Sequence, residues 1–444
     1  MRPTALLTDH YELTMLQAAL RSGTADRRSA FELFSRRLNG GRRYGVVAGT
    51  GRVLDALEAF RFGAEELAYL REHRVVDDTT LEWLAAYRFS GDVWGYGEGD
   101  VYFPGSPLLV VESSFAEAVL LETVLLSILN HDSAVASAAS RMISAAAGRP
   151  CIEMGSRRTH EWSAVAAARA AYVAGFQVTS NLQAGSEYGV PTSGTSAHSF
   201  TLLHDTERDA FQAQVTSLGK DTTLLVDTYD IAAAVRAAVD IAGPELGAVR
   251  IDSGDLAVLA RRVRRQLDDL GATSTRIVVT GDLDEFAIAG LAAAPVDGYG
   301  VGTCLVTGSG QPTSGFVYKL VARAASTDPA APLVAVAKKS KDKLSIGGRK
   351  WALRRRDTDG VAEVELIGIG EPPVDDGDDR ELLLRLVQGG DIVGRESLEA
   401  ARERHQLAVA ELPEEAHKLS GGAPAIPTHY IGDTRGTSVD PFAS

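Results

Sequence analysis

Residues 249–270 read VRIDSGDLAVLARRVRRQLDDL, which is one complete strand–loop–helix unit. A short apolar run at Val249–Ile251 leads into the polar cluster DSGD at 252–255, and the spacing of apolar residues predicts an amphipathic helix over Leu256–Leu270. A buried strand, a polar loop and a helix in this order are typical of the units that build parallel β-sheets. The fold class follows from this pattern.

The same pattern recurs between residues 150 and 303. Further apolar runs end in polar clusters at Cys151–Met154 with GSRR, Phe176–Val178 with TSN, Thr223–Val226 with DTYD, Arg276–Val279 with TGDLDE, and Val296–Tyr299 with GVGT, and the polar run Ser193–His198 belongs to the same series. Roughly seven such units without a single glycine-rich dinucleotide motif favour a closed or nearly closed β/α barrel over a Rossmann sheet. We therefore expect an α/β fold with an irregular β/α barrel.

After residue 315 the pattern changes. Strands are predicted at Phe316–Val321 and Leu333–Lys338, followed by a basic stretch at 338–356. The remaining residues are acidic and are expected to be irregular, with one helix near Leu398–Glu411 and a loop from Ala423 onward. This part of the chain therefore lies outside the barrel pattern.

Composition and charge narrow the class of protein. The chain has 444 residues and a formal net charge of −14, so it is expected to form two or three domains and not to bind nucleic acid nonspecifically. Its two cysteines, Cys151 and Cys304, are far apart, which excludes a disulfide scaffold and a cysteine-based zinc site. The N-terminal residues contain no long apolar run of the kind found in signal peptides. We expect a cytoplasmic protein.

The most apolar segment of the chain is not a membrane span. It is Ala116–Leu129, within a predicted helical stretch at Ser113–Ala147, and it contains Glu117 and Glu122. A bilayer requires about 20 consecutive apolar residues in a helix, and this segment is shorter and charged. We expect a buried helix here and no membrane partner.

A single histidine, His198, stands among small residues in GTSAHS at 194–199. One interpretation is a surface turn, and the other is a nucleophile or base with room for a bulky, charged substrate. Chemistry in β/α barrels gathers on the loops at the C-terminal ends of the strands. Those loops also contain Arg157, Asn181, Asp227, Arg250, Asp252, Asp255 and Asp282. Their common location favours the second interpretation.

Two neighbouring loops have the composition of phosphate sites. GVGT at 300–303 contributes Gly300, Gly302 and Thr303, and TGDLDE at 280–285 contributes Gly281. Glycines allow backbone N–H groups to converge on an anion, and a threonine hydroxyl adds a donor. Since phosphate sites in β/α barrels often use the last loops together, we expect these loops to hold a phosphate.

Charged residues on the other loops allow two interpretations each. In an extended segment Arg250 and Asp252 share a face, so they form either an internal ion pair or a site in which Arg250 grips a carboxylate or phosphate. The acids would then hold sugar hydroxyls or Mg²⁺. Arg157 and its neighbour in GSRR lie at the mouth of the site or face solvent. In DTYD at 227–230, an aspartate is expected to cap the following helix.

Eight blocks of the sequence together resemble the nicotinate phosphoribosyltransferase family. They are LLTDHYELTM (6–15), FELFSRRLNGGRRYGVVAG (31–49), EMGSRRTH (153–160), TSNLQAG (179–185), VPTSGTSAHSF (190–200), LLVDTYD (224–230), VRIDSGDL (249–256) and YGVGTCLVT (299–307). The resemblance implies a type II phosphoribosyltransferase fold, with an irregular β/α barrel at 136–315 and an α+β domain formed by 1–135 and completed by 316–444. It also implies a homodimer with a shared active site, in which the N-terminal tyrosine reaches the neighbour's site.

The resemblance also implies a reaction. Nicotinate and 5-phosphoribosyl 1-diphosphate give nicotinate mononucleotide and diphosphate in NAD salvage, with hydrolysis of ATP to ADP and phosphate coupled to the transfer. The enzyme would be of the ATP-dependent, ligase type, with Mg²⁺ as cofactor. His198 is the position that matches the histidine phosphorylated by ATP in the family, so small neighbours would leave space for a phosphoryl group.

Roles for other residues follow from the same resemblance. Tyr11 and Thr195 are expected to contact nicotinate, and Arg250 to pair with its carboxylate. Asp252 is expected to act in catalysis by contacting the ribose hydroxyls or the metal, whose other ligands stay unassigned. Arg157 and Asn181 are further substrate-binding positions, and Gly281, Gly300, Gly302 and Thr303 are the phosphate-binding positions.

The chain departs from the family pattern at SIGGRK (345–350), where a proline–glycine pair is usual, and this leaves the role of Lys350 open. Lys338 and Lys339 are interpreted as a solvated basic face rather than as contacts to ATP or pyrophosphate. Three alternatives are kept: a nicotinamide phosphoribosyltransferase, a non-enzymatic barrel that binds phosphorylated sugars, and a metal-assisted barrel hydrolase. The hydrolase would use Asp227, Asp252, Asp255 and Asp282.

Overall fold

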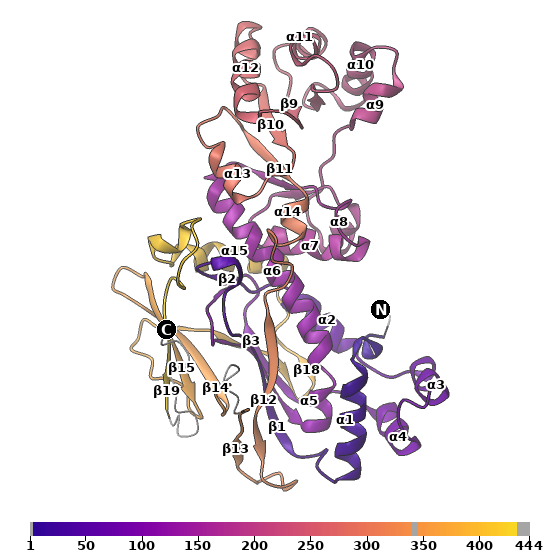
Figure 1. Cartoon of the computed structure of the whole chain (residues 1–444), viewed down its shortest axis with the longest axis vertical. Helices are drawn as coiled ribbons and strands as arrows, with labels where there is room; N and C mark the ends of the chain where they lie inside the picture. The colour runs from indigo at the N-terminus through magenta and orange to yellow at the C-terminus, as the bar shows by residue number, and fades with distance from the viewer. Residues whose placement is uncertain (1–2, 339–344, 433–444) are drawn as a thin grey trace. The chain divides into compact units, whose positions relative to one another are not determined.

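The computed structural model describes residues 3–338 and 345–432. The chain divides into two compact units (Figure 1). We call residues 135–312 the parallel unit and the described residues of 1–134 and 313–444 the antiparallel unit, after the strand pairing in each. No helix within the described ranges has the length and apolar character needed to cross a bilayer.

The parallel unit contains a six-stranded sheet in which every neighbouring pair is parallel. The order is β7 (Val178–Thr179), β6 (Cys151–Glu153), β11 (Gly298–Val301), β10 (Arg276–Thr280), β9 (Ala248–Ile251) and β8 (Thr223–Leu225). The α/β class and the parallel sheet are confirmed. The expectation of about seven strands in a nearly closed barrel is wrong for this sheet, because residues 193–197 form no strand and Thr192 makes only an isolated bridge to Thr179.

Helices follow these strands as the sequence pattern predicts. They are α7 (Glu161–Val173), α8 (Leu182–Tyr188), α9 (His198–Leu203), α10 (Glu207–Leu218), α11 (Ile231–Ala242), α12 (Leu256–Asp269), α13 (Glu285–Gly290) and α14 (Thr303–Val306). In Figure 1, α10, α11 and α12 pack side by side. Asp230, Asp255 and Asp284 each accept a hydrogen bond from a backbone N–H of the helix that follows. Part of the acid-rich loop sequence therefore serves as helix caps.

The antiparallel unit contains a seven-stranded sheet in which all pairs are antiparallel. Its order is β13 (Leu333–Ala335), β12 (Phe316–Ala324), β1 (Arg28–Ser35), β5 (Pro107–Ser114), β3 (Asp92–Tyr96), β17 (Leu383–Gln388) and β18 (Asp391–Ile392). The helices are α1 (His10–Arg21), α2 (Thr50–Glu58), α3 (Ala64–Glu72), α4 (Asp78–Ala86), α5 (Phe115–Val119) and α15 (Leu398–Ala410), with short 3₁₀ turns at Ala5–Leu7, Asn39–Gly41 and Glu414–His417. One apolar core joins the buried faces of this sheet and of α1 to α5.

Two smaller sheets complete this unit. One has four strands in the order β16 (Arg380–Glu381), β14 (Lys350–Arg356), β15 (Ala362–Ile369) and β19 (Thr428–Ile431), and the other pairs β2 (Gly45–Val46) with β4 (Val101–Tyr102). The predicted helix over 113–147 is interrupted after Val119, and α6 (Glu122–Ala146) continues it. The expectation of an irregular C-terminal segment is wrong for the described residues, since β15 to β19 lie within it, while the helix predicted near Leu398–Glu411 is confirmed as α15. The part of the expected loop beyond residue 432 lies outside the described residues.

The basic stretch at 338–356 differs from a solvated face in its second half. Lys350 is buried and its Nζ atom lies 2.7 Å from Glu32 Oε2. Arg354, also buried, donates hydrogen bonds to Asp100 and Glu365. A strand built around buried ion pairs looks like a charged surface in sequence, and the sequence therefore left the role of Lys350 open. Lys338 is exposed. Lys339 lies outside the described residues.

Candidate active site

His198 and Asp227 form a hydrogen-bonded pair in the parallel unit. His198 is the first residue of α9, and Asp227 follows β8, with 3.2 Å between His198 Nε2 and Asp227 Oδ1. The Asp227 side chain is 1% exposed, whereas that of His198 is 41% exposed. A buried carboxylate that faces an accessible imidazole orients the ring and stabilises its positive charge.

Asp227 is held in place from its other side. Its Oδ2 atom accepts a hydrogen bond from the backbone N–H of Asp252 at 2.9 Å and one from the Ser253 hydroxyl at 2.8 Å. These contacts fix the carboxylate, and the carboxylate fixes the proton of His198 on Nε2. The free lone pair of the neutral ring is then on Nδ1, which is the nitrogen available for nucleophilic attack.

Arg250, at the end of β9, lies against the segment that precedes His198. Its Nη1 atom donates to Thr195 Oγ1 at 3.1 Å and its Nη2 atom donates to the carbonyl of Ser196 at 3.1 Å. Burial lowers the pKa of Arg250, and the charge of Arg157 adds to this effect, while Asp252 and Asp227 oppose it. A partly desolvated guanidinium next to a second arginine is suited to binding an anion.

Asp252 contacts the neighbouring strand. The Thr280 hydroxyl at the end of β10 donates to Asp252 Oδ1. The hydrogen bonds of Arg250 and Asp252 therefore go to different partners, and this geometry differs from the simple internal ion pair considered above. Asp255 accepts from the backbone N–H of Val258 at 3.1 Å and caps α12, so its role is structural.

The two glycine loops follow adjacent strands. Thr280 of β10 pairs with Gly300 of β11, so Gly281 and Gly302 leave the sheet at the same edge. Gly281 has φ +110°, and a Cβ atom there would lie 2.6 Å from the Asp252 carbonyl oxygen. The close approach and the positive φ both require glycine at position 281. Asp282 also has a positive φ of 36°, in the left-handed region that residues other than glycine rarely adopt.

Gly302 and Thr303 occupy the turn between β11 and α14. Thr303 is the first residue of this short helix and Gly302 precedes it. A Cβ atom on Gly302 would lie 4.0 Å from Arg158 Cγ, which places the Arg158 side chain beside this turn. On Gly300, a Cβ atom would lie 2.4 Å from Thr280 Cγ2. The loop thus combines accessible backbone with a nearby cation, as an anion site requires.

Asn181 and Arg157 lie on the loops after β7 and β6. Asn181 accepts from the Ala184 N–H and caps α8, and its Nδ2 donates to Ser156 Oγ at 3.0 Å. The buried carboxylate of Glu153 accepts from the backbone N–H of Gly155 and from Thr179, and burial raises its pKa. Arg157 is exposed. These contacts give Asn181 a structural role in shaping the loop that presents Arg157.

Tyr11 belongs to the antiparallel unit, on α1. Its side chain is 42% exposed. Its pKa is raised by partial burial and by the negative charges of Glu122 and Glu12, so the hydroxyl is a hydrogen-bond donor at neutral pH. The other expected site residues belong to the parallel unit.

Two features of this site are absent from the sequence-based expectations. Asp227 was expected on the same face as His198 and as a possible helix cap, but its pairing with His198 was not predicted; Asp230 caps α11 and Asp227 holds His198. Glu207, in the first turn of α10, has a buried Oε1 atom without a hydrogen-bond partner among the described residues. Burial and the charges of Asp230 and Asp227 raise its pKa to about 6. An acid in the first turn of a helix is common, so no specific signal marks Glu207 in the sequence.

Comparison with known sequences finds a family match and a close relative. Residues 6–130 match the model described as the nicotinate phosphoribosyltransferase N-terminal domain. The nicotinate phosphoribosyltransferase pncB1 of Mycobacterium tuberculosis is 58% identical over 438 residues, covering 97% of this chain and 96% of that protein. The human nicotinate phosphoribosyltransferase is 31% identical over 436 residues, covering 83% of this chain and 80% of that protein.

Solved structures agree with these matches. The crystal structure of human nicotinic acid phosphoribosyltransferase superposes with a TM-score of 0.80 at 27% identity, covering 96% of this chain and 97% of that one. The nicotinate-nucleotide pyrophosphorylase of Pyrococcus furiosus has a TM-score of 0.74 at 23% identity, covering 92% and 95% of the two chains. The second match is a likeness of fold. Together they confirm the expected type II phosphoribosyltransferase architecture.

Proposed function

Because the chain belongs to the nicotinate phosphoribosyltransferase family, we propose that it joins nicotinate to 5-phosphoribosyl 1-diphosphate in an ATP-coupled step of NAD salvage. The single observation that supports the coupled mechanism most is the pairing of His198 with the buried carboxylate of Asp227. An accessible imidazole with an ordered tautomer is suited to accepting a phosphoryl group.

In the coupling step, His198 Nδ1 attacks the γ-phosphorus of ATP. A new N–P bond forms as the bond to the β,γ-bridging oxygen breaks, and ADP leaves with that electron pair. The phosphorylated ring carries a proton on Nε2, and Asp227 stabilises the resulting positive charge. Hydrolysis later transfers the phosphoryl group to water and releases phosphate, which restores the neutral histidine.

Nicotinate is bound next to this histidine. Arg250 would pair with the nicotinate carboxylate, and Thr195 would supply a hydroxyl from the segment that Arg250 already contacts at 3.1 Å. A guanidinium favours a carboxylate over a neutral amide because the charged hydrogen bond is stronger. This preference supports nicotinate over nicotinamide as the substrate.

The transfer step needs no general base. The pyridine nitrogen attacks C1 of the ribose with its own lone pair as the bond from C1 to the diphosphate oxygen breaks, and diphosphate carries away the electron pair. Asp252, at the strand end beside Thr280, is suited to contact the ribose hydroxyls and to stabilise positive charge at C1. Gly281, Gly302 and Thr303 would hold the 5-phosphate.

The donor set of the parallel unit fits Mg²⁺, which in phosphate sites uses one or two carboxylates together with substrate oxygens. Asp252 and Asp282 are the carboxylates that we propose as ligands. Bound Mg²⁺ would neutralise charge on the diphosphate leaving group. Within the described ranges, the one cluster of three carboxylates with metal-like spacing is Asp375, Asp376 and Asp379, in the antiparallel unit.

We also propose a homodimer in which Tyr11 completes the neighbour's site. The N-terminal segment presents several exposed apolar side chains, at Leu6 (41%), Leu7 (60%), Tyr11 (42%) and Met15 (36%). Such side chains near one another in sequence favour a protein–protein contact.

We also propose that the protein acts in the cytoplasm. Both cysteines are free, which agrees with a reducing compartment.

The alternatives explain fewer of these contacts. A metal-assisted hydrolase would need Asp227 and Asp255 as metal ligands, but Asp227 accepts from His198, Asp252 and Ser253, and Asp255 caps α12. A barrel that only binds phosphorylated sugars gives the His198–Asp227 pair no role.

The test is product formation with purified protein, Mg²⁺ and 5-phosphoribosyl 1-diphosphate. Nicotinate and nicotinamide are assayed in parallel, each with and without ATP. We expect nicotinate mononucleotide as the product, strong stimulation by ATP with one ADP released per transfer, and little reaction with nicotinamide. Faster reaction with nicotinamide would overturn the assigned substrate, and equal rates with and without ATP would overturn the coupling.

A further inference from the structure

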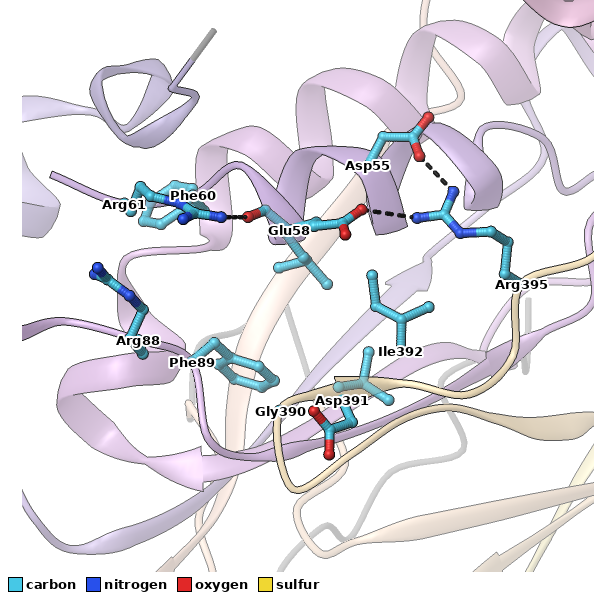
Figure 2. A pocket seen from close by; sticks show the side chains of 12 residues that line it. Asp55, Glu58, Phe60, Arg61, Arg88, Phe89, Gly390, Asp391, Ile392 and Arg395 are labelled. Carbon is cyan, nitrogen blue, oxygen red and sulfur yellow. Dashed lines mark hydrogen bonds and ion pairs between the residues drawn. The ribbon is translucent and has the colours of Figure 1, made fainter. Parts of the chain in front are cut away.

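The antiparallel unit contains a hollow of about 730 Å³ that the proposed reaction does not use. It lies beside α2, the residues that follow α4, and the β17–β18 hairpin (Figure 2). Its volume falls within the range of small-molecule sites, about 300–1,000 Å³. We therefore consider the residues that line it as a binding site for a second ligand.

The arginines of this hollow differ in their partners. Arg395 is neutralised, because its guanidinium contacts Asp55 at 2.5 Å and Glu58 at 3.1 Å. Arg61 donates to the backbone carbonyl of Glu58, and Arg88 to that of Tyr87. Among the described residues neither Arg61 nor Arg88 makes an ion pair. The hollow also carries the carboxylates of Asp55, Glu58 and Asp391, so the formal charges of its lining are balanced. Arg61 and Arg88, at the end away from Arg395, are the guanidinium groups left to bind an anion.

Apolar side chains lie next to these arginines. Figure 2 shows Arg61 and Arg88 at one end of the hollow, with the Phe89 ring and Ile392 along its wall. Phe89 and Ile392 are half-buried, so part of each faces the hollow. The exposed Asp391 lies by the same wall and offers carboxylate oxygens. The hollow thus has two guanidinium groups at one end, apolar side chains along its wall, and a carboxylate that can accept hydrogen bonds.

We propose that this hollow binds a nucleoside monophosphate as a non-substrate ligand. The dianionic phosphate would bind Arg61 and Arg88, since guanidinium groups match phosphate oxygens in charge and geometry. The planar base would pack on Phe89 and Ile392, and Asp391 would accept from the ribose hydroxyls. The site is separate from the residues assigned to catalysis, so ligand binding and turnover can be tested independently.

The test measures binding of adenosine monophosphate to the full chain by calorimetry, with inorganic phosphate and adenosine as separate arms. We expect one ligand bound per chain at this site, with affinity that exceeds that of either fragment. The double variant Arg61→Ala/Arg88→Ala should bind at least about tenfold more weakly, because it loses two charged hydrogen-bond donors. Arg71→Ala, an exposed arginine of α3, is the matched control and should bind like the parent chain.

Transferase activity measured without added adenosine monophosphate should be the same in the parent chain and the double variant, which separates this proposal from the proposed function. Equal nucleotide affinity in both proteins would overturn the proposal, as would the absence of binding. Inorganic phosphate that binds as tightly as the nucleotide would overturn the role of the apolar wall. A shift of the double variant to a lower oligomeric state would assign the hollow to a second copy of the chain instead.

Discussion

Asp227, whose side chain is 1% exposed, holds the Nε2 atom of the accessible His198 at 3.2 Å and is itself held by the backbone N–H of Asp252 at 2.9 Å. The pair joins the loop after β8 to the loop after β9 and to the start of α9. The position of the Asp227 carboxylate against His198 therefore depends on the register of the neighbouring strands β8 and β9.

Asp227→Asn should slow phosphorylation of His198 by about a hundredfold, because the amide keeps the size of the side chain but removes the charge that stabilises the imidazolium. The measurement is single-turnover transfer from ATP. Asp230→Asn is the control, since Asp230 caps α11 from the same loop. An unchanged rate in Asp227→Asn would show that the pair has no role in phosphoryl transfer.

Arg250→Ala should raise the KM for nicotinate by about tenfold to a hundredfold, the effect of losing a charged hydrogen bond. The KM for 5-phosphoribosyl 1-diphosphate should change much less. Arg250→Lys keeps the positive charge but loses the two-pronged hydrogen-bond geometry, so its KM for nicotinate should lie between those of the parent chain and Arg250→Ala. Steady-state kinetics with each substrate varied in turn decide the matter, and equal changes in both constants would refute the assignment of Arg250 to nicotinate.

Glu207 makes stability depend on pH. Its pKa of about 6 in the folded state lies above the ordinary value of 4.5. Between these values the folded protein binds more protons than the unfolded protein, so the free energy of unfolding falls as pH rises through this window. Glu207→Gln should remove that part of the fall and be more stable than the parent chain above about pH 6.

Urea denaturation of the two proteins across this pH range measures the difference, with Glu187→Gln, at an exposed glutamate of α8, as the control. A difference between parent and Glu207→Gln that stays constant with pH would show that Glu207 does not titrate in this window.

Lys350 is predicted to act on stability and not on the reaction. Lys350→Met leaves the buried carboxylate of Glu32 without its ammonium partner and should cost about 3–5 kcal/mol of unfolding free energy. The double variant Lys350→Met/Glu32→Leu should recover most of this loss, because an apolar pair replaces the ion pair. Denaturation and activity are measured together. Loss of ATP coupling in the well-folded double variant would instead place Lys350 in the nucleotide site.

The sequence predicted the parallel sheet well because its short apolar runs are bounded by polar loops, as around Ile251 and Thr280. It failed where burial and charge coincide. The role of Lys350 stayed open and Arg354 was not singled out, because a basic run in sequence does not show that these side chains lie in a strand whose charges are paired inside the fold. The strand β19 contains few strongly apolar residues, and its pairing with β15 comes from tertiary contacts that local propensity does not encode.

The site shows the same division. The sequence predicted that His198, Arg250 and Asp252 would lie on loops at one edge of the sheet, because the strands are parallel. It could not assign Asp227 to His198, because an aspartate before a helix fits the capping pattern equally well. Which of two aspartates, Asp227 or Asp230, caps α11 depends on the path of the loop, and only the folded chain determines that path.

The most direct test of the phosphohistidine mechanism is to incubate the protein with ATP labelled in its γ-phosphate and to locate the label under alkaline conditions that preserve phosphohistidine. We expect about one labelled phosphoryl group per active site, on Nδ1 of His198. His198→Ala should carry no label and should retain slow synthesis without stimulation by ATP. Label on another residue, or full stimulation by ATP in His198→Ala, would refute the phosphohistidine mechanism.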